Sequence, residues 1–250
     1  MADIKLVALD MDGTLLDEHS RISEENRSAI ADVQAAGVTV IFATGRGIPS
    51  LEPYRQELAL ISPIVAVNGS EVWRGPGDLH VRHSLPLDDV MALREVALRE
   101  SCWYWAYSSV GVFNRENWDL LRETQATAVW LKFGYLTAGP DQLSRVRKRA
   151  KDVGEFEFTN SHPLNIEINP LGVTKATGVR DVCTLLGISM AEVMAVGDSL
   201  NDAALLREAG VGVAMGNAQD EVKELADAVT GTNQEDGVAQ AIRRFVLNRS

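Results

Sequence analysis

The sequence predicts an α/β fold in which a doubly wound parallel sheet carries an inserted α+β domain. Short apolar runs rich in Val, Ile, Leu and Ala alternate with helical stretches near both ends of the 250-residue chain. Continuous apolar strands separated by helices are typical of a parallel sheet that is covered on both faces. The middle of the chain breaks this alternation, and it holds four of the five Trp residues, Trp103, Trp105, Trp118 and Trp130.

The first third of the chain predicts three strands and one helix. Apolar runs that each lead into a loop with Gly cover residues 4–9, 38–43 and 63–67. A helix is predicted over residues 23–36, because Ser23 suits the N-cap position and Gly37 suits the position at which a helix ends. The sequence Gly75-Pro76-Gly77 then predicts the turn of a hairpin.

The alternation of strands and helices resumes after residue 173. It predicts a helix to residue 186, a strand at 193–196, a helix at 202–209, a strand at 211–214 and a helix at 219–226. Between these two regions, helical segments are joined to stretches of alternating polarity at 128–135 and 155–158. We therefore predict a Rossmann-like core domain formed by residues 1–83 and 170–250, and an inserted α+β domain at 84–169.

The charge balance of the chain is acidic. There are 35 acidic and 24 basic residues, a formal net charge of −11, which disfavours binding to nucleic acid or to anionic membranes. No segment has the roughly 18 continuous apolar residues of a membrane helix, and the N-terminal apolar run is too short for a signal sequence. We therefore expect a cytoplasmic protein, a monomer or weak homodimer, with Cys102 and Cys183 as free thiols.

Two carboxylates follow the first predicted strand directly, in the sequence Asp10-Met11-Asp12-Gly13-Thr14. Carboxylates this close repel each other unless a cation or a shared proton relieves the repulsion. In an α/β sheet, ligands bind beyond the carboxyl ends of the strands, which is where Asp10 and Asp12 fall. The alternative is a surface turn, because Asp and Gly are common in turns.

The second predicted strand ends in Thr44-Gly45-Arg46, where the next helix begins. This tripeptide offers a hydroxyl, a backbone N–H and a guanidinium, which are the donors that bind a phosphate at a helix N-terminus. A helix cap followed by a surface Arg is the alternative interpretation.

Lys175 stands at the start of a predicted helix, where the helix macrodipole disfavours a cation. Such departures from a local rule are expected at functional sites, and a Lys that reaches toward an anionic centre would account for this one. The alternative is a Lys that is simply exposed to solvent.

A second pair of acids, Asp198 and Asp202, lies where the strand at 193–196 turns into a helix. Their spacing of four residues allows both side chains to approach the same point. A few hard oxygen ligands, with room for water and a phosphate oxygen, indicate Mg²⁺ better than Ca²⁺ or Zn²⁺. An N-capped helix without a metal is the alternative.

Together, these segments resemble the four ordered motifs of the haloacid dehalogenase superfamily, and more narrowly its Cof-type phosphatases with a type IIB (C2) cap. The resemblance spans nearly the whole chain and is specific in the core domain. It implies a Mg²⁺-dependent phosphatase that hydrolyses a small phosphate ester, such as a sugar phosphate, through an aspartyl-phosphate intermediate. A phosphomutase, a phosphatase of FMN or pyridoxal phosphate, and a regulatory protein on a silent phosphatase fold are the alternatives.

The resemblance also implies a role for each motif residue. Asp10 would be the nucleophile and Asp12 the general acid–base. Mg²⁺ would be bound by Asp10, the backbone carbonyl of Asp12 and Asp198, with Asp202 steadying the metal site from outside its coordination sphere. The phosphoryl oxygens would be held by Met11 N–H, Thr44, Gly45, Lys175 and Asn201.

The inserted domain is expected to act as a cap that excludes water and contacts the substrate. Arg46 from the core domain and Trp105, Trp130 and Lys132 from the cap are the candidate substrate contacts. For the aromatic residues, packing inside the cap is the alternative. The four His residues lie outside the motifs, and we expect them to be surface or structural residues: His19, His80, His83 and His162.

Overall fold

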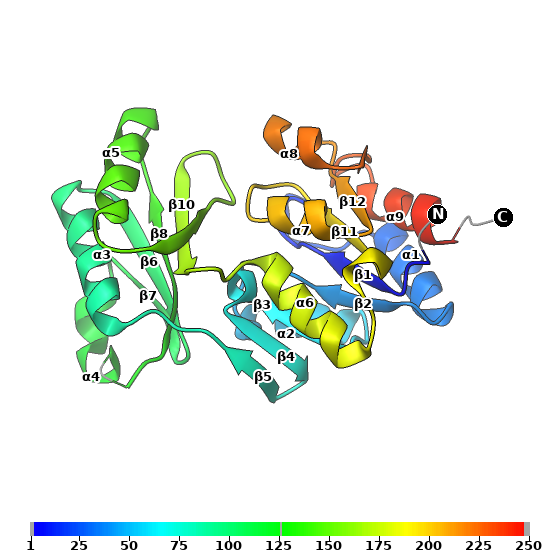
Figure 1. The fold of residues 1–250 in the computed structure, drawn as a ribbon, viewed down its shortest axis with the longest axis horizontal. Coiled ribbons are helices and arrows are strands. Elements are labelled where there is room, and N and C mark those ends of the chain that lie inside the picture. The colour runs from blue at the N-terminus through cyan, green and yellow to red at the C-terminus, as the bar shows by residue number, and fades with distance from the viewer. Residues whose placement is uncertain (1–2, 126, 248–250) are drawn as a thin grey trace. The chain divides into compact units, whose positions relative to one another are not determined.

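The computed structural model describes residues 3–125 and 127–247, and the chain forms two compact units. The first unit combines Met1–Val81 with Thr174–Ser250, and the second is Arg82–Val173 (Figure 1). The predicted boundaries at residues 84 and 169 both fall inside the second unit. The role of this unit as a cap stays a prediction.

The first unit is built on a parallel sheet with the strand order β13-β12-β11-β1-β2. The strands are β1 (Leu6–Leu9), β2 (Thr39–Phe42), β11 (Val193–Gly197), β12 (Val211–Ala214) and β13 (Ala228–Val229). β1 pairs in parallel with both β11 and β2, and the chain moves outward from β1 in both directions. The carboxyl ends of β1 and β11 therefore form a topological switch point, where α/β sheets bind ligands. The predicted fold class is confirmed.

The helices of the first unit are α1 (Glu24–Ala35), α2 (Ile48–Glu57), α6 (Lys175–Leu186), α7 (Ala203–Glu208), α8 (Asp220–Leu225) and α9 (Gly237–Ile242). Four of them lie within one residue of the predicted bounds, at 24–35, 175–186, 203–208 and 220–225, whereas no bounds were predicted for the helices at 48–57 and 237–242. The Ser23 hydroxyl caps α1 by accepting the Asn26 N–H at 3.1 Å. At the start of α6, the Thr174 hydroxyl accepts the Thr177 N–H at 3.1 Å. This cap fixes Lys175 in the first turn of α6.

A small sheet with the order β3-β4-β5 adjoins the parallel sheet. Its strands are β3 (Ile64–Ala66), β4 (Glu71–Gly75) and β5 (Asp78–Arg82), and Ala43 makes a parallel bridge to Val65 of β3. The predicted hairpin turn lies between β4 and β5, where Gly77 has a φ of +72°. A short 3₁₀ turn at Val67–Gly69 joins β3 to β4.

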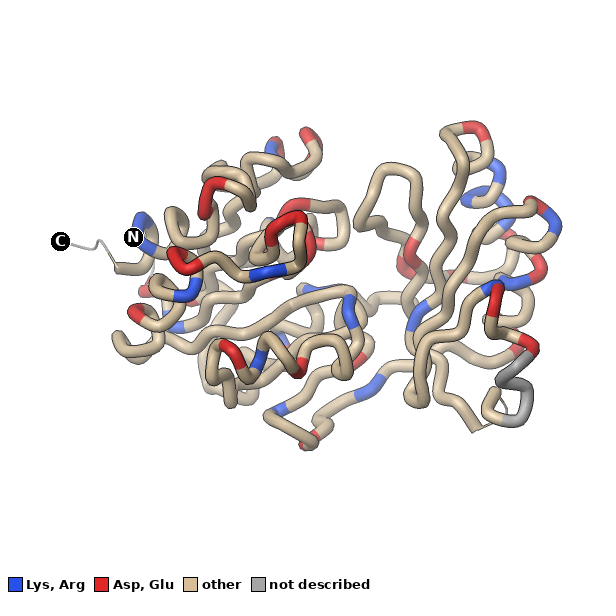
Figure 2. Tube along the Cα trace, turned by 180° about the vertical axis from the view of Figure 1, so that it is seen from behind, with Lys and Arg blue, Asp and Glu red and all other residues tan. Residues whose placement is uncertain are grey.

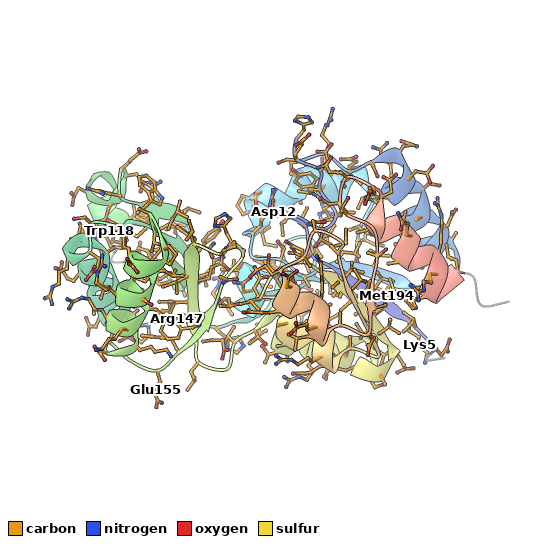
Figure 3. All side chains as sticks on the ribbon, turned by 90° about the horizontal axis from the view of Figure 1, so that it is seen from above. Lys5, Asp12, Trp118, Arg147, Glu155 and Met194 are labelled. Atoms are coloured by element: carbon orange, nitrogen blue, oxygen red, sulfur yellow. The ribbon has the colours of Figure 1, made fainter. Side chains whose placement is uncertain are left out.

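The second unit is an antiparallel sheet with the order β7-β6-β8-β10-β9. Its strands are β6 (Trp103–Ser108), β7 (Gly111–Asn114), β8 (Trp130–Leu136), β9 (Phe156–Thr159) and β10 (Asn165–Pro170), and its helices are α3 (Leu87–Arg99), α4 (Arg122–Gln125) and α5 (Pro140–Lys151). α3 and α5 pack against each other, and α3 also contacts β6 and β8. One face of the sheet therefore forms an apolar core, which contains Trp118, whereas Arg147 of α5 and Glu155 are exposed (Figure 3).

Helix α5 is strongly basic although the whole chain is acidic (Figure 2). Part of this charge is paired, because Arg145 and Arg149 both donate to the carboxylate of Glu100, at 3.0 and 2.6 Å. These two bonds fasten α5 to the end of α3. Within the described part of the chain, no helix combines the length and the apolar character needed to span a membrane.

Candidate active site

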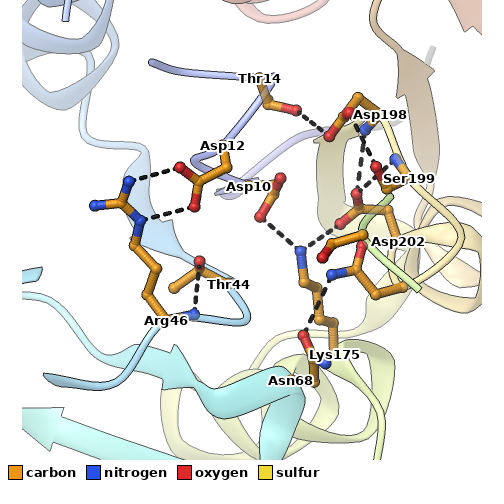
Figure 4. A network of polar contacts seen from close by, with 12 residues as sticks. Asp10, Asp12, Thr14, Thr44, Arg46, Asn68, Lys175, Asp198, Ser199 and Asp202 are labelled. Carbon is orange, nitrogen blue, oxygen red and sulfur yellow. Dashed lines mark hydrogen bonds and ion pairs between the residues drawn. The ribbon is translucent and has the colours of Figure 1, made fainter. Parts of the chain in front are cut away.

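Asp10 follows β1 at the switch point of the parallel sheet. Its N–H donates to the carbonyl of Val196 in β11 at 3.0 Å, so the pairing of the two strands continues one residue beyond β1. This pairing brings Asp10 to the same edge of the sheet as Asp198, although the two residues lie far apart in the sequence (Figure 4). The geometry agrees with the expectation that the strand ends meet.

Lys175 lies between two carboxylates in the interior of the first unit. Its Nζ donates to Asp10 Oδ1 at 2.6 Å and to Asp202 Oδ1 at 2.8 Å, and its side chain is 0% exposed. Burial alone would lower the pKa of Lys175, but the two carboxylates raise it above its ordinary value. The same carboxylates compensate the unfavourable position of a cation at a helix N-terminus. Lys175 therefore stays an ammonium.

Three carboxylates, from Asp10, Asp198 and Asp202, each offer an oxygen within 4.8 Å of the others. Together with the Lys175 ammonium they carry a charge of about −2 when all are ionised. Burial raises the pKa of Asp10 well above its ordinary value, even though Lys175 opposes this shift, and it raises that of Asp198 to about 6. A divalent cation would balance the remaining charge, and hard carboxylate oxygens suit Mg²⁺. The residues therefore fit the predicted cofactor.

Both oxygens of Asp202 already have protein partners. Oδ1 accepts from Lys175, while Oδ2 accepts the backbone N–H groups of Asp198 and Ser199 at 3.1 and 3.2 Å. The strand enters this loop through Gly197, where a Cβ atom would lie 2.3 Å from Asp202 Cγ. Asp202 therefore holds the loop that carries Asp198, and its expected role outside the coordination sphere of the metal stays a prediction.

The loop after β1 is supported by residues that sequence reasoning missed. Gly13 has a φ of +76°, and a Cβ there would lie 2.6 Å from Asp198 Oδ2. Asn217 Nδ2 donates to the Gly13 carbonyl at 2.7 Å, and Asn217 Oδ1 accepts the Asn233 N–H at 2.9 Å. The hydroxyl of Ser199 donates to Asp198 Oδ2 at 3.0 Å. Asn217 and Asn233 carry no local signal, because their role depends on contacts between distant loops.

Asp12 is paired with Arg46. The guanidinium donates through Nε to Asp12 Oδ2 at 2.7 Å and through Nη2 to Oδ1 at 2.5 Å, and it lies over the Tyr54 ring. These hydrogen bonds raise the pKa of Arg46 further above its ordinary value. The Asp12 side chain is 60% exposed, in contrast to the buried carboxylate of Asp10. Arg46, a candidate substrate contact, thus orients Asp12 in this structure.

The remaining candidates for phosphate binding lie in loops around Lys175. Thr44 is buried, and its hydroxyl accepts the Arg46 N–H at 3.2 Å across Gly45. Met11 is also buried, and its carbonyl accepts the N–H groups of two following residues in the tight loop after β1. Asn201 Nδ2 donates to Asn68 Oδ1 at 3.3 Å, whereas Asn201 Oδ1 is buried without a partner among the described residues.

The chain is similar to known proteins along most of its length. The sequence pattern of the haloacid dehalogenase-like hydrolases matches residues 7–135 and 123–242. The chain belongs to this family. It is similar to the 5-amino-6-(5-phospho-D-ribitylamino)uracil phosphatase YcsE of Bacillus subtilis, with 43% identity over 98% of this chain and 97% of that protein. It is also similar to the pyridoxal phosphate phosphatase YbhA of Escherichia coli, with 30% identity over 97% and 99%.

Among solved structures, the fold matches that of the haloacid dehalogenase subclass IIB sugar phosphatase BT4131. The TM-score is 0.83 at 24% sequence identity, over 96% of this chain and 98% of that chain. The predicted membership in the haloacid dehalogenase superfamily is confirmed, and the chain is a phosphatase of this family whose fold matches that of a subclass IIB member.

In this phosphatase, the candidate substrate contacts of the second unit lie on opposite faces of its sheet. Trp105 is half-buried and lies against Gly134, where a Cβ atom would be 2.3 Å from the indole ring. Lys132 is buried on the same face, with its Nζ 3.4 Å from Glu167 Oε1 and 4.8 Å from the centroid of the Tyr107 ring.

Trp130 instead belongs to the apolar core of the second unit. Its ring stacks on Trp118 with a centroid distance of 5.4 Å, and its Nε1 has no partner within the described chain. Simple alternation along β8 would place Trp130 and Lys132 on the same face of the sheet. The pairing of β8 with β6 is shifted, however: Tyr107 pairs with Lys132, the next residue Ser108 pairs with Trp130, and Leu131 has no partner in β6. Such a bulge reverses the inward and outward faces. Because the ring of Trp130 packs in the apolar core, the structure does not favour Trp130 as a substrate contact.

Binding of Mg²⁺ by this phosphatase is expected to weaken as the pH falls below about 6. The pKa of Asp198 is raised from 3.8 to about 6 by burial and by the charge of Asp202, and a proton on Asp198 competes with the metal. Affinity should fall by about tenfold per pH unit below that value. Isothermal titration with Mg²⁺ between pH 5 and pH 8 would measure this dependence, and an affinity that is unchanged from pH 7 to pH 5 would contradict it.

The same shift predicts the opposite trend for stability of the metal-free protein. At Asp198 the folded chain binds more protons than the unfolded chain between pH 3.8 and about 6. The stabilisation from this carboxyl is present below that window and is lost as the pH rises through it. Thermal unfolding in EDTA, followed as a function of pH, measures this trend, and the same series in Mg²⁺ is the control.

Proposed function

We propose that this phosphatase hydrolyses a small phosphate monoester in a Mg²⁺-dependent reaction that passes through an aspartyl-phosphate on Asp10. The observation that supports this most strongly is the buried Asp10 carboxylate, held by Lys175 among three converging acids, with the Asp12–Arg46 pair nearby. Phosphoryl transfer depends on positioning and charge stabilisation, which such a cluster provides.

In the first half-reaction, one carboxylate oxygen of Asp10 attacks phosphorus while Lys175 holds the other. A bond forms between this oxygen and phosphorus, the bond from phosphorus to the ester oxygen breaks, and Asp12 as general acid passes a proton to the leaving alcohol. Thr44, Asn201 and the Gly45 N–H hold the equatorial phosphoryl oxygens.

In the second half-reaction, Asp12 takes a proton from water, and the water oxygen attacks phosphorus. The acyl-phosphate bond breaks, so that Asp10 is released as a carboxylate together with inorganic phosphate. Mg²⁺, bound by Asp10, Asp198 and the Asp12 carbonyl, would supply the positive charge that keeps the Asp10 carboxylate ionised and stabilises the phosphoryl oxygens.

We further propose 5-amino-6-(5-phospho-D-ribitylamino)uracil as the substrate. This proposal rests on the 43% identity to the B. subtilis phosphatase named for that compound, which extends over 98% of this chain. Pyridoxal phosphate is the second candidate, because the E. coli relative at 30% identity is named for it. The absence of nucleic-acid and membrane partners, the monomeric or weakly dimeric state and the cytoplasmic location remain predictions.

Phosphate release from a panel of esters tests these proposals. The panel contains the phosphoribitylaminouracil, pyridoxal phosphate, FMN and several sugar phosphates, each with Mg²⁺ and with EDTA. We expect the phosphoribitylaminouracil to have a kcat/KM at least about tenfold above the others, since one favourable contact is sufficient for such a difference, and no turnover in EDTA.

The possible outcomes separate the substrate from the reaction. A clear preference for another ester would overturn the substrate and leave the reaction intact. Turnover that requires a sugar bisphosphate as activator would identify a mutase. Release of phosphate from none of the esters, with Mg²⁺ present and the protein folded, would overturn the proposed reaction.

A further inference from the structure

Three consecutive residues between β3 and β4 have left-handed backbone conformations. Val67, Asn68 and Gly69 have φ angles of +51°, +57° and +97°, and all three are buried. Positive φ is an outlier for a β-branched residue such as Val67. Strain of this kind persists where surrounding contacts determine the backbone, and it concentrates at functional sites. We call Val67–Gly69 the 67–69 turn.

The backbone of the 67–69 turn holds the predicted phosphate-binding loop. Val67 N–H donates to the Arg46 carbonyl at 2.9 Å, and Asn68 N–H donates to the Thr44 carbonyl at 2.9 Å. In return, Thr44 N–H donates to the Val65 carbonyl at 2.9 Å, just before the turn. Three backbone hydrogen bonds therefore fix the loop that carries Thr44 and Gly45.

The turn also touches the start of helix α6, which carries Lys175. A Cβ on Gly69 would lie 2.1 Å from the Thr174 carbonyl oxygen, so the backbones approach as closely as only glycine permits. Within α6, a Cβ on Gly178 would lie 3.3 Å from the Cα of Gly69. The first turn of α6 is thus packed directly on the 67–69 turn.

The side chain of Asn68 reaches a third loop. Its Oδ1 accepts from Asn201 Nδ2 at 3.3 Å, and both residues are buried (Figure 4). A primary amide has two N–H bonds, so one of them can hold Asn68 while the other remains available to a phosphoryl oxygen. Because Asn68 presents an acceptor, it selects the amide orientation in which the nitrogen of Asn201, and not its oxygen, points toward the 67–69 turn.

We propose that the 67–69 turn is a positioning element that sets the Thr44 loop, the Lys175 helix and Asn201 in one fixed arrangement. Within it, Asn68 is a positioning residue that acts through Asn201. Asn is one of the few residues with a side chain that adopts the left-handed conformation readily. Backbone conformation alone would be satisfied by Gly, whereas the bond to Asn201 requires the amide. The inference rests on the phosphoryl-transfer function proposed above.

A double-mutant cycle tests this inference. Asn68→Gly keeps the left-handed backbone and deletes the side chain, Asn201→Ala deletes its partner, and the third variant combines both. We expect Asn68→Gly to lower kcat by about tenfold with KM within about threefold, and the double variant to be no worse than Asn201→Ala, because the two changes remove one shared interaction. Kinetics are measured with the best ester of the panel.

Two further variants separate positioning from folding. Asn26→Ala also removes a buried Asn of the first unit, one that accepts the Ala239 N–H at 2.9 Å, and it should lower Tm without changing kcat. Asn68→Asp keeps both the acceptor oxygen and the tolerance for positive φ, and it should have a higher kcat than Asn68→Gly. If Asn68→Gly does not fold, the comparison of Asn68→Asp with Asn68→Ala replaces it.

The inference is overturned if Asn68→Gly has the kcat of the parent, or if the losses from Asn68→Gly and Asn201→Ala multiply in the double variant. A second measurement, the rise in Tm on addition of inorganic phosphate with Mg²⁺, does not need turnover. If no ester is hydrolysed, the proposed function has failed. The positioning role is then supported if Asn68→Gly and Asn201→Ala reduce this rise in Tm equally, and it is overturned if they do not.

Discussion

Replacing Asp10 by Asn is expected to reduce kcat for every phosphate ester by roughly 10⁴-fold or more, the range in which loss of a covalent nucleophile falls. An amide oxygen is a poor nucleophile and a poor Mg²⁺ ligand, and the amide also loses the ion pair that Lys175 makes with Asp10 at 2.6 Å. Steady-state kinetics with Mg²⁺ measure the effect. Activity within about tenfold of the parent, a barrier change of only ~1.4 kcal/mol, would exclude Asp10 as the nucleophile.

Asp10→Asn should not impair folding when metal is absent. Burial and the neighbouring carboxylates raise the pKa of Asp10, so its ionised form opposes folding at neutral pH, and the neutral amide removes that opposition. We therefore expect a Tm in EDTA equal to or above that of the parent. Asp12→Asn is the matched control: it should also lose turnover, but its exposed side chain pairs with Arg46, so no rise in Tm is expected.

The parallel core was predictable because its signals are local. Strands β1 and β11 are buried along their whole length, and this burial requires the continuous apolar runs that the sequence shows. The caps at Ser23 and Thr174 depend on residues three positions apart. Asp10 and Asp198 follow strands that meet at the switch point, so their convergence also follows from the order of the strands.

The features that were not predictable depend on contacts between distant segments. Asn217 supports the loop after β1 from a position 204 residues away in the sequence. Arg46 and Asp12 lie 34 residues apart in the sequence. Arg46 was expected to contact the substrate, whereas in the structure its guanidinium orients the carboxylate of Asp12. In β8, the skipped Leu131 changes which residues face the core, and alternation in the sequence cannot reveal a bulge.

Replacing Lys175 by Met is expected to lower kcat/KM for all substrates by one common factor of roughly 10³ or more. A loss of this size follows when a main electrostatic contact of a transition state is removed. Lys175 is buried between Asp10 and Asp202, so Met fills the space but leaves the carboxylates without their ammonium. The metal-free variant should therefore be much less stable at neutral pH, and Mg²⁺ should restore part of this stability. Values of kcat/KM over the ester panel, measured in Mg²⁺ on folded protein, give the factor for each substrate.

Two Trp variants of the second unit provide the contrast. Trp105→Ala removes a half-buried ring on the face that carries Lys132. It should change the ratios of kcat/KM between substrates by an amount equivalent to about 1–3 kcal/mol, and so change their ranking. Trp130→Ala removes a ring that stacks on Trp118 in the core, so it should lower Tm and leave the ranking unchanged. If Trp105→Ala lowers kcat/KM equally for every substrate while Lys175→Met reorders the substrates, both assignments are wrong, because a residue that contacts the phosphoryl group shared by all substrates should not discriminate between them.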